Sequence, residues 1–374
     1  MEVHITSKQM VKPSSSELHL LKPFNLSLLD QLAIRKYTPA IFFYGKPSDS
    51  YIDGSQFSEQ LKQTLSKVLT QFYPAAGRVK NNPFITDFDE GVPCVETSVK
   101  GRLSDFIEST KKLEEMNRLL PYRPFCYIQD SAAPQLTVQV KIFDCGGIAL
   151  GLCYLHKIFD AASIFAFLKS WAAFSRGLNG EIPNPGLLFF NGGGRKITRT
   201  YVFDANAIST LKLIAKSKSL EQSSRVLAVS AFEWKHAMQA SRSVSGTLKA
   251  TILFQPVNLR PKFKPALPSY SIGNMFSMAS SMYNPVGKYI DLSELSYLVR
   301  EATKSAPNDP QTLFSIPGIH NREFSNGFVL KEARQHNAIE VWITLSDKEM
   351  GFLERDPEFL AFASPSSYFD KSEI

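Results

Sequence analysis

Hydrophobic positions follow three different patterns in the first half of the chain. Residues 57–72 place an apolar side chain at every third or fourth position, which predicts an amphipathic helix. Residues 136–142 alternate between apolar and polar side chains, the pattern of a strand with one buried face. Residues 148–155 are apolar throughout, which predicts a strand buried on both faces.

The helical period returns after Asp160. Apolar side chains between residues 164 and 174 mark one face of a helix, so His156 is expected at the end of a strand and Asp160 at or near the start of the helix. Gly146 and Gly147, which lie between the two preceding strands, indicate a turn or a bulge. The first half is therefore expected to mix helices and strands.

Residues 178–200 contain two prolines and three consecutive glycines, and we expect them to link two domains. The second half of the chain favours helices over 205–217 and 223–242, strands over 250–257 and 339–345, and a proline-rich loop over 258–274. Ser346 and Glu349 form a predicted capping box for a final helix. The chain is therefore predicted to be a two-domain α/β protein, with domains over residues 1–177 and 201–374.

The composition is that of an ordinary globular protein with ample material for a large core: 374 residues, of which 44% are hydrophobic and 21% are charged. No stretch is apolar for long enough to span a bilayer, and the N-terminus lacks the pattern of a secretory signal. The four cysteines are scattered, without a CxxC pair or zinc spacing, so we expect free thiols in a cytoplasmic protein.

The formal net charge of +7 would suit a polyphosphate ligand such as coenzyme A, or nucleic acid. The basic residues are dispersed, however, and no motif combines basic and aromatic residues as RNA-binding proteins do. We therefore expect no nucleic acid partner and assign most of the charge to solvated surface.

His156 and Asp160 are the strongest candidates for catalysis. A histidine and an aspartate four residues apart at such a junction can act as a base and its orienting carboxylate. A hydroxyl that attacks a thioester needs a base near neutral pH, and histidine side chains ordinarily titrate close to that range. In the alternative interpretation, His156 is a core histidine with a satisfied hydrogen bond and Asp160 is an N-cap. Both roles can be true of Asp160 if it fixes the turn that aims His156.

Other catalytic classes lack their signatures. No serine lies in a GxSxG elbow, so the nucleophile of an α/β-hydrolase is not indicated. No cluster of His, Cys, Asp and Glu has metal-ligand spacing, so no metal site is expected.

Residues 143–171, FDCGGIALGLCYLHKIFDAASIFAFLKSW, closely resemble the HxxxD region of the BAHD acyltransferases of plant specialised metabolism. Three other segments agree: residues 26–31 resemble the LSxxD motif of this family, residues 73–78 its YPLAGR motif, and residues 255–260 with Gly273-Asn274 its VNxR…GN segment. HxxxD alone is a weak pattern, but these segments in this order are specific. The sequence HKIFDAAS is similar to the branch of the family that contains vinorine synthase and salutaridinol acetyltransferase.

The resemblance implies a two-domain α/β fold like that of chloramphenicol acetyltransferase, with a channel between the domains. It implies that an acyl-CoA, with acetyl-CoA the first choice, is the co-substrate. The acceptor would be a hydroxyl of a small-molecule alcohol such as an alkaloid or a terpenoid. The family is usually monomeric, and we expect no permanently bound cofactor and no membrane partner.

The resemblance also assigns roles to single residues. His156 would be the general base in a direct transfer without a covalent intermediate, and Asp160 would hold the local structure. Asn258 and Arg260 of the VNxR segment would be structural residues near the site, as would Gly146 and Gly147. It assigns no residue to the binding of coenzyme A.

The chain departs from the family in its second half. The family carries a DFGWG motif before the last strands, and this motif is absent here. Between Lys304 and Gly327 the chain has only a short tract, so we expect a shortened C-terminal domain with an open sheet edge where a strand is lost. In the family the aspartate of DFGWG pairs with an arginine of the VNxR segment, so Arg260 is expected to be stranded, exposed or paired anew. These departures leave a second hypothesis open, a non-catalytic relative that binds at most a ligand or a partner.

Overall fold

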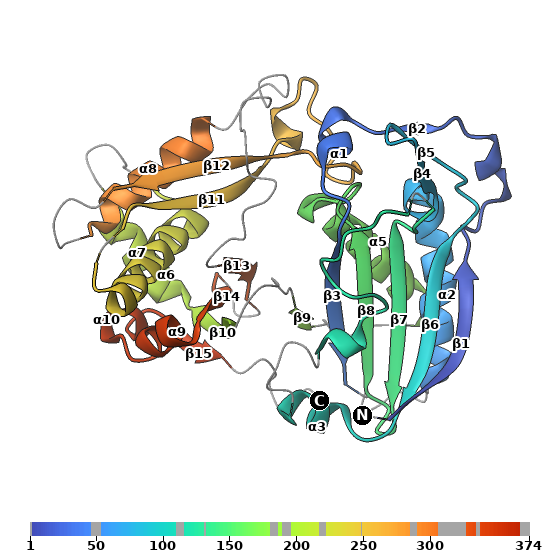
Figure 1. Cartoon of the computed structure of the whole chain (residues 1–374), viewed down its shortest axis with the longest axis horizontal. Helices are drawn as coiled ribbons and strands as arrows, with labels where there is room; N and C mark the ends of the chain where they lie inside the picture. Colours follow the sequence, from blue (N-terminus) through green and yellow to red (C-terminus); the bar gives the residue numbers. More distant parts are fainter. Residues whose placement is uncertain are drawn as a thin grey trace. The chain divides into compact units, whose positions relative to one another are not determined.

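The computed structural model describes residues 2–45, 54–109, 116–130, 132–179, 186–188, 196–216, 222–247, 249–284, 290–305, 327–333 and 337–366. The chain divides into two compact units, coloured along the sequence in Figure 1. The first unit comprises residues 1–192, 266–275 and 369–374, and the second comprises residues 193–265 and 276–368. The predicted two-domain α/β architecture is thereby confirmed, and the channel expected between the domains stays a prediction.

A six-stranded sheet forms the centre of the first unit. Its order is β1 (Val3–Val11), β6 (Val92–Val99), β7 (Leu136–Phe143), β8 (Ile148–Leu155), β3 (Tyr37–Tyr44) and β9 (Gly186–Leu188). Neighbouring strands are antiparallel except for β6 and β7, which are parallel. The strands predicted over residues 136–142 and 148–155 are confirmed as β7 and β8, and the predicted turn at Gly146 joins them.

Helices α2 (Gly54–Gln71) and α5 (Ala161–Asn179) lie along one face of this sheet (Figure 1). Leu65 and Leu69 of α2, Leu152 of β8 and Trp171 of α5 belong to one buried hydrophobic cluster. The indole N–H of Trp171 donates to the backbone carbonyl of Leu61 at 3.1 Å, which joins the two helices. The amphipathic helix predicted over residues 57–72 is confirmed, because its apolar positions enter this cluster.

The opposite face of β7 and β8 is covered by the segment that contains the short 3-10 helix η3 (Asn117–Leu119). A Cβ on Gly151 would collide with the carbonyl oxygen of Leu119, so only glycine lets this segment approach the strand so closely. The amide nitrogen of Gln139, in the orientation that satisfies its neighbours, donates to the carbonyl of Leu120 at 2.8 Å. All eight residues of β8 are buried, as the continuous apolar pattern predicts.

Lys141 of β7 is a buried cation, only 2% exposed. Its ammonium group donates to the carbonyl oxygen of the Gln139 side chain at 2.9 Å, with Thr97 Oγ1 at 3.5 Å. Burial, together with the positive charge of Arg118, lowers the pKa of Lys141 to about 8. The folded state therefore disfavours the charged form of this lysine.

Shorter elements complete the first unit. They are β2 (Phe24–Asn25), β5 (Phe84–Thr86) and β4 (Arg78–Lys80), which form a three-stranded sheet, with α1 (Leu28–Leu32), α3 (Leu103–Ser109) and the 3-10 helices η1 (Ser16–Leu20) and η2 (Tyr73–Ala76). The capping box of Ser27 and Asp30 begins α1.

Residues 266–275 return to the first unit, although they connect β11 (Thr251–Asn258) and β12 (Phe276–Tyr283) of the second. The predicted division into residues 1–177 and 201–374 did not include this return. Within the segment, Gly273 forms a parallel bridge with Phe159. The φ of Gly273 is +132°, a region that residues with a Cβ rarely adopt. An added Cβ would lie 3.0 Å from Met275 Cε and 3.2 Å from Asp30 Oδ2, so glycine is required here for two reasons.

The second unit contains an antiparallel four-stranded sheet, a two-stranded sheet formed by β11 and β12, and several helices. The larger sheet has the order β13 (Gly327–Glu332), β14 (Ile339–Ser346), β10 (Lys196–Phe203) and β15 (Ser364–Ser366). The helices are α6 (Ala205–Ile214), α7 (Arg225–Ser245), α8 (Leu292–Ser305), α9 (Asp347–Leu353), α10 (Pro357–Leu360) and the 3-10 helix η4 (Arg260–Lys262). The predicted helices over 205–217 and 223–242 and the strand over 339–345 are confirmed, and the predicted capping box of Ser346 and Glu349 begins α9.

The predicted linker over residues 178–200 contains the end of α5, strand β9 and the first half of β10. Within the described residues, β11 and β12 pair only with each other, and β13, which starts directly after the short tract, pairs only with β14. In the same part of the chain, no helix is long and apolar enough to cross a membrane.

Replacing Lys141 with methionine is expected to stabilise the protein at pH 7, by about 1–3 kcal/mol. Below pH 8 Lys141 is charged in both the folded and the unfolded protein, and burial of the charge lowers the stability of the folded state. Between pH 8 and the ordinary lysine pKa of 10.5, only the unfolded chain binds the proton. The stability of the wild type therefore rises with pH in this window, and the advantage of Lys141→Met should shrink towards pH 10.5. Thermal unfolding at several pH values checks this, with exposed Lys8→Met as the control. An advantage that is independent of pH would contradict the assignment.

Replacing Gly273 with alanine is expected to destabilise the first unit by about 1–3 kcal/mol, because the φ is strained and the Cβ crowds the carboxylate of Asp30. Gly101→Ala is the matched control, since its φ is +108° but an added Cβ meets nothing within 4 Å. Urea unfolding should show a larger loss for Gly273→Ala than for Gly101→Ala. Equal losses would mean that crowding by Asp30 contributes nothing.

Candidate functional site

His156 directly follows the last residue of β8, as predicted, and its backbone is held on both sides. Its N–H donates to the carbonyl of Lys36 at 3.0 Å, and its carbonyl accepts from the side-chain amide of Asn274 at 2.9 Å. The side chain is partly exposed. By contrast, the ring of His236 in α7 is fully buried, and its Nδ1 lies 2.8 Å from Asp356 Oδ2. His156 therefore differs from a fully buried structural histidine of this same chain.

Asp160 is buried at the start of α5 and binds two segments with its two carboxylate oxygens. Oδ1 accepts from the backbone N–H of Ser163 at 2.8 Å and lies 2.9 Å from its hydroxyl, which identifies Asp160 as the N-cap of the helix. Oδ2 accepts from the backbone N–H of Met275 at 3.0 Å. The carboxylate thus ties the start of α5 to the segment that returns from the second unit.

Asp30, the acidic residue of the LSxxD motif, is also buried, and is 2% exposed. Oδ2 accepts from the backbone N–H and the hydroxyl of Ser27, at 3.0 and 2.6 Å. Oδ1 accepts from the backbone N–H and the side-chain amide of Asn274, at 2.6 and 3.0 Å. One carboxylate therefore receives four hydrogen bonds, and these satisfy a charge that would otherwise be costly to bury.

Lys157 follows His156 and is 1% exposed. Its ammonium group donates to the carbonyls of Asp30 and Gln31, at 2.9 and 3.1 Å, near the C-terminal end of the short helix α1. Carbonyls at a helix end have no partner within the helix and attract a cation. Burial lowers the pKa of Lys157, and the nearby charge of Arg35 acts in the same direction while Asp30 opposes both.

Three motifs that are far apart in the sequence therefore meet at one turn. Asn274 shows this most clearly, because its amide nitrogen lies within hydrogen-bonding distance of Asp30 Oδ1, of the carbonyl of His156 and of the carbonyl of Lys157. Sequence reasoning did not select Asp30, Lys157 or Asn274 as site residues. The signal for Asp30 and Asn274 was present, since both belong to motifs of the resemblance, but their contact with the turn is a property of the tertiary structure.

The prediction that Gly146 and Gly147 lie near the site is wrong. They precede β8, whereas His156 follows it, and eight residues of strand separate the two ends by roughly 25 Å. Gly146, with a φ of +82°, instead allows the tight turn between β7 and β8.

Asn258 and Arg260 belong to the second unit and contact each other. Arg260 is buried, and its backbone N–H and Nη1 donate to Oδ1 of Asn258 at 3.1 and 3.3 Å. Arg260 was expected to be stranded, exposed or paired anew. Exposure is wrong, because the side chain is buried, and Asn258 is a partner of its guanidinium.

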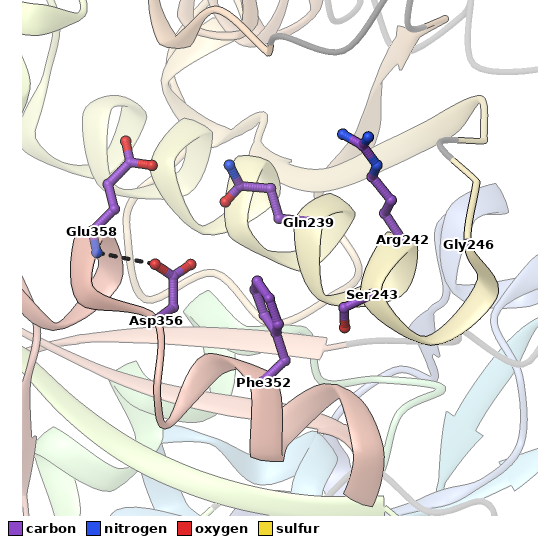
Figure 2. A pocket seen from close by; sticks show the side chains of 7 residues that line it. All are labelled: Gln239, Arg242, Ser243, Gly246, Phe352, Asp356 and Glu358. Atoms are coloured by element: carbon purple, nitrogen blue, oxygen red, sulfur yellow. Dashed lines mark hydrogen bonds between the residues drawn. The ribbon is translucent and has the colours of Figure 1, made fainter.

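The second unit also contains a pocket of about 360 Å³ between the C-terminal end of α7 and the α9–α10 region (Figure 2). It is lined by Gln239, Arg242, Ser243, Gly246, Phe352, Asp356 and Glu358. Its two carboxylates are already engaged, because Asp356 accepts the N–H of Glu358 at 3.0 Å and binds His236, while Glu358 pairs with Lys235. None of the predicted site residues lines this pocket, so it does not carry the candidate chemistry.

In the described part of the chain, no three His, Cys, Asp or Glu side chains form a group that could hold a metal ion. The residues at the turn offer a histidine held by its backbone and two buried carboxylates that serve as acceptors. Such an arrangement can move a proton at His156, and it suits general acid–base catalysis.

Comparison with known proteins identifies the relatives of this chain. The chain matches the Transferase family over residues 1–185 and 194–311. Stemmadenine O-acetyltransferase from Catharanthus roseus is 31% identical over 411 residues, which cover 95% of this chain and 97% of that protein. Vinorine synthase from Rauvolfia serpentina is 31% identical over 402 residues, which cover 93% of this chain and 95% of that protein.

Solved structures give the same result for the fold. The crystal structure of vinorine synthase superposes with a TM-score of 0.77 at 27% identity, covering 98% of this chain and all of that one. The structure of F. graminearum TRI101 complexed with coenzyme A and T-2 mycotoxin has the same fold, with a TM-score of 0.64 at 16% identity and 92% of this chain covered. The motifs, the family match over most of the chain and the similarity to vinorine synthase lead to one conclusion: this chain belongs to the Transferase family of BAHD acyltransferases, enzymes that use an acyl-CoA as co-substrate.

Proposed function

We propose that this protein transfers an acetyl group from acetyl-CoA to a hydroxyl of a plant specialised metabolite, an alkaloid or a terpenoid, with His156 as general base. The observation that carries the proposal is the position of His156, which is partly exposed at the end of β8 with its backbone N–H and carbonyl both held. The activities for which relatives are named support the acetyl group, since these relatives include O-acetyltransferases for stemmadenine and for limonoids.

The proposed reaction is a direct transfer. His156 accepts the proton of the acceptor hydroxyl while the oxygen attacks the carbonyl carbon of the thioester. The tetrahedral intermediate then expels the sulfur, the C–S bond breaks, and the proton passes from His156 to the leaving thiolate. The products are the acetate ester and free coenzyme A, and no covalent enzyme intermediate is needed.

Asp160 has a structural part in this proposal. Its carboxylate caps α5 through Ser163 and binds the backbone of Met275, so it fixes the α5 end of the turn that carries His156 to the returning segment. A carboxylate committed to these N–H groups supports the histidine through the backbone. The role resembles the positioning role that the HxxxD resemblance implies.

Replacing His156 with alanine is expected to lower kcat by roughly 10²- to 10⁴-fold, because the base is lost while the fold is kept. The measurement is the release of free coenzyme A from acetyl-CoA in a screen of alkaloid and terpenoid alcohols. His4→Ala is the matched control, since His4 is exposed on β1. Turnover of His156→Ala at the rate of the wild type, in a protein with an unchanged melting temperature, would rule out His156 as the base.

A second candidate function, a non-catalytic relative, is favoured by one specific observation. The alignments with stemmadenine O-acetyltransferase and vinorine synthase extend over 411 and 402 residues, more than the 374 residues of this chain, so they open gaps in it. The family match also ends at residue 311, inside the short tract after Lys304. Both facts agree with the loss of a segment that the catalytic relatives have.

Calorimetric titration of the folded protein with acetyl-CoA separates the two candidates without knowledge of the acceptor. Saturable binding, together with His156-dependent turnover of any alcohol, supports the transferase and excludes the non-catalytic relative. Absence of binding by a protein that melts cooperatively supports the non-catalytic relative, because it means that the lost segment was needed for the donor.

A further inference from the structure

We propose that Asn274 is a positioning residue for His156, acting by holding the backbone of the turn that carries the histidine. The inference rests on the proposed function, since it assumes that the orientation of His156 matters for catalysis. It concerns a residue that is nearly 250 positions from Asp30 in the sequence and that reaches the turn from the segment 266–275.

The side-chain amide of Asn274 lies against two backbone carbonyls of the turn. The carbonyls of His156 and Lys157 follow the end of β8 and precede α5, so they lie outside the ladder and the helix that satisfy most backbone groups. Asn274 Nδ2 lies 2.9 Å from the first and 3.0 Å from the second. One side chain therefore satisfies two consecutive carbonyls of the catalytic turn.

Asp30 fixes the orientation of this amide. Nδ2 also lies 3.0 Å from Oδ1 of Asp30, so three acceptors surround two hydrogens and one hydrogen bond is shared. The same Oδ1 accepts the backbone N–H of Asn274 at 2.6 Å. A hydrogen bond to an ionised carboxylate is stronger than one between neutral groups, so Asp30 anchors the amide and directs its nitrogen towards the turn.

Asp30, Lys157 and Asn274 are connected in a closed network of hydrogen bonds. The side chain of Lys157 fixes the turn to α1, because its ammonium group binds the carbonyls of Asp30 and Gln31. Asn274 holds the same residue at its carbonyl and is itself bound to Asp30. The turn is thus fixed to α1 at two points, and only one of them depends on Asn274.

The burial of Asn274 distinguishes a positioning role from substrate binding. Asn274 is 3% exposed, so it offers almost no surface to a substrate. Its loss should let the peptide plane of His156 rotate, which moves the Cα–Cβ direction of the histidine. A displacement of about 1 Å at a catalytic group can lower a rate 100-fold, so the effect should appear in kcat and leave KM unchanged.

Asn274→Ala tests the inference and is expected to lower kcat by roughly 10- to 100-fold, with the KM for acetyl-CoA and for the acceptor unchanged. Asn274→Ser keeps one hydroxyl donor and should lie between the alanine variant and the wild type. Thr137→Val is the control, because it removes one buried hydrogen bond of the first unit, to the carbonyl of Cys153 in β8, without touching the turn. It should keep the kcat of the wild type.

A measurement without turnover completes the test. The chain has six histidines, so the ring signal of His156 can be assigned in a ¹³C-labelled sample by its loss in His156→Ala. The signal should shift or broaden in Asn274→Ala and Asn274→Ser, and stay unchanged in Thr137→Val. These spectra report on positioning even if Asn274→Ala is too unstable to assay, because the serine variant is measured alongside it.

Different results would overturn the proposed function and the positioning role of Asn274. If His156→Ala remains active, the proposed function fails whatever Asn274 does. If His156→Ala is inactive while Asn274→Ala and Asn274→Ser keep both the wild-type kcat and the wild-type His156 signal, only the positioning role is overturned. A fall in stability for Asn274→Ala without any change in kcat or in that signal would also overturn it and leave a purely structural residue.

Discussion

The structure around His156 depends on the hydrogen bonds that the buried carboxylate of Asp30 accepts. A charge in the interior is strongly unfavourable unless hydrogen bonds compensate for it, and here four donors do so. Two of these donors come from Ser27 next to it and two from Asn274, far away in the sequence. The need to satisfy one charge therefore joins α1 to the segment 266–275 and leaves the amide of Asn274 facing the turn after β8.

Asp160 is a second buried carboxylate that joins two segments, at the end of the turn where α5 begins. It caps α5 with one oxygen and binds the backbone N–H of Met275 with the other, directly beside Asn274. Two buried carboxylates from two motifs thus hold two consecutive residues of the returning segment. Gly273 makes this possible, because any Cβ at that position would crowd Asp30. A catalytic group needs this kind of support, since small displacements have large effects on rate.

The contacts described for the turn are all made within the first unit, whereas the short tract after Lys304 belongs to the second. If a segment is missing after Lys304, as the second hypothesis holds, its loss lies in the other unit from these contacts. Arg260, which was expected to lose a partner in the same shortened region, is buried with Asn258 against its guanidinium. A buried guanidinium needs such acceptors, since it cannot lose its charge.

The sequence by itself determined four elements of the first unit, and with them the position of His156 at the end of a strand. Amphipathic and continuous apolar patterns predicted α2, β7, β8 and α5, because burial follows a local period that a single segment displays. The motifs in their order also indicated the family. Only the tertiary structure showed that Asn274 reaches His156 and that Gly151 lies against Leu119. These facts depend on which distant segments pack together, and a hydrogen bond between residues 30 and 274 leaves no period in either segment.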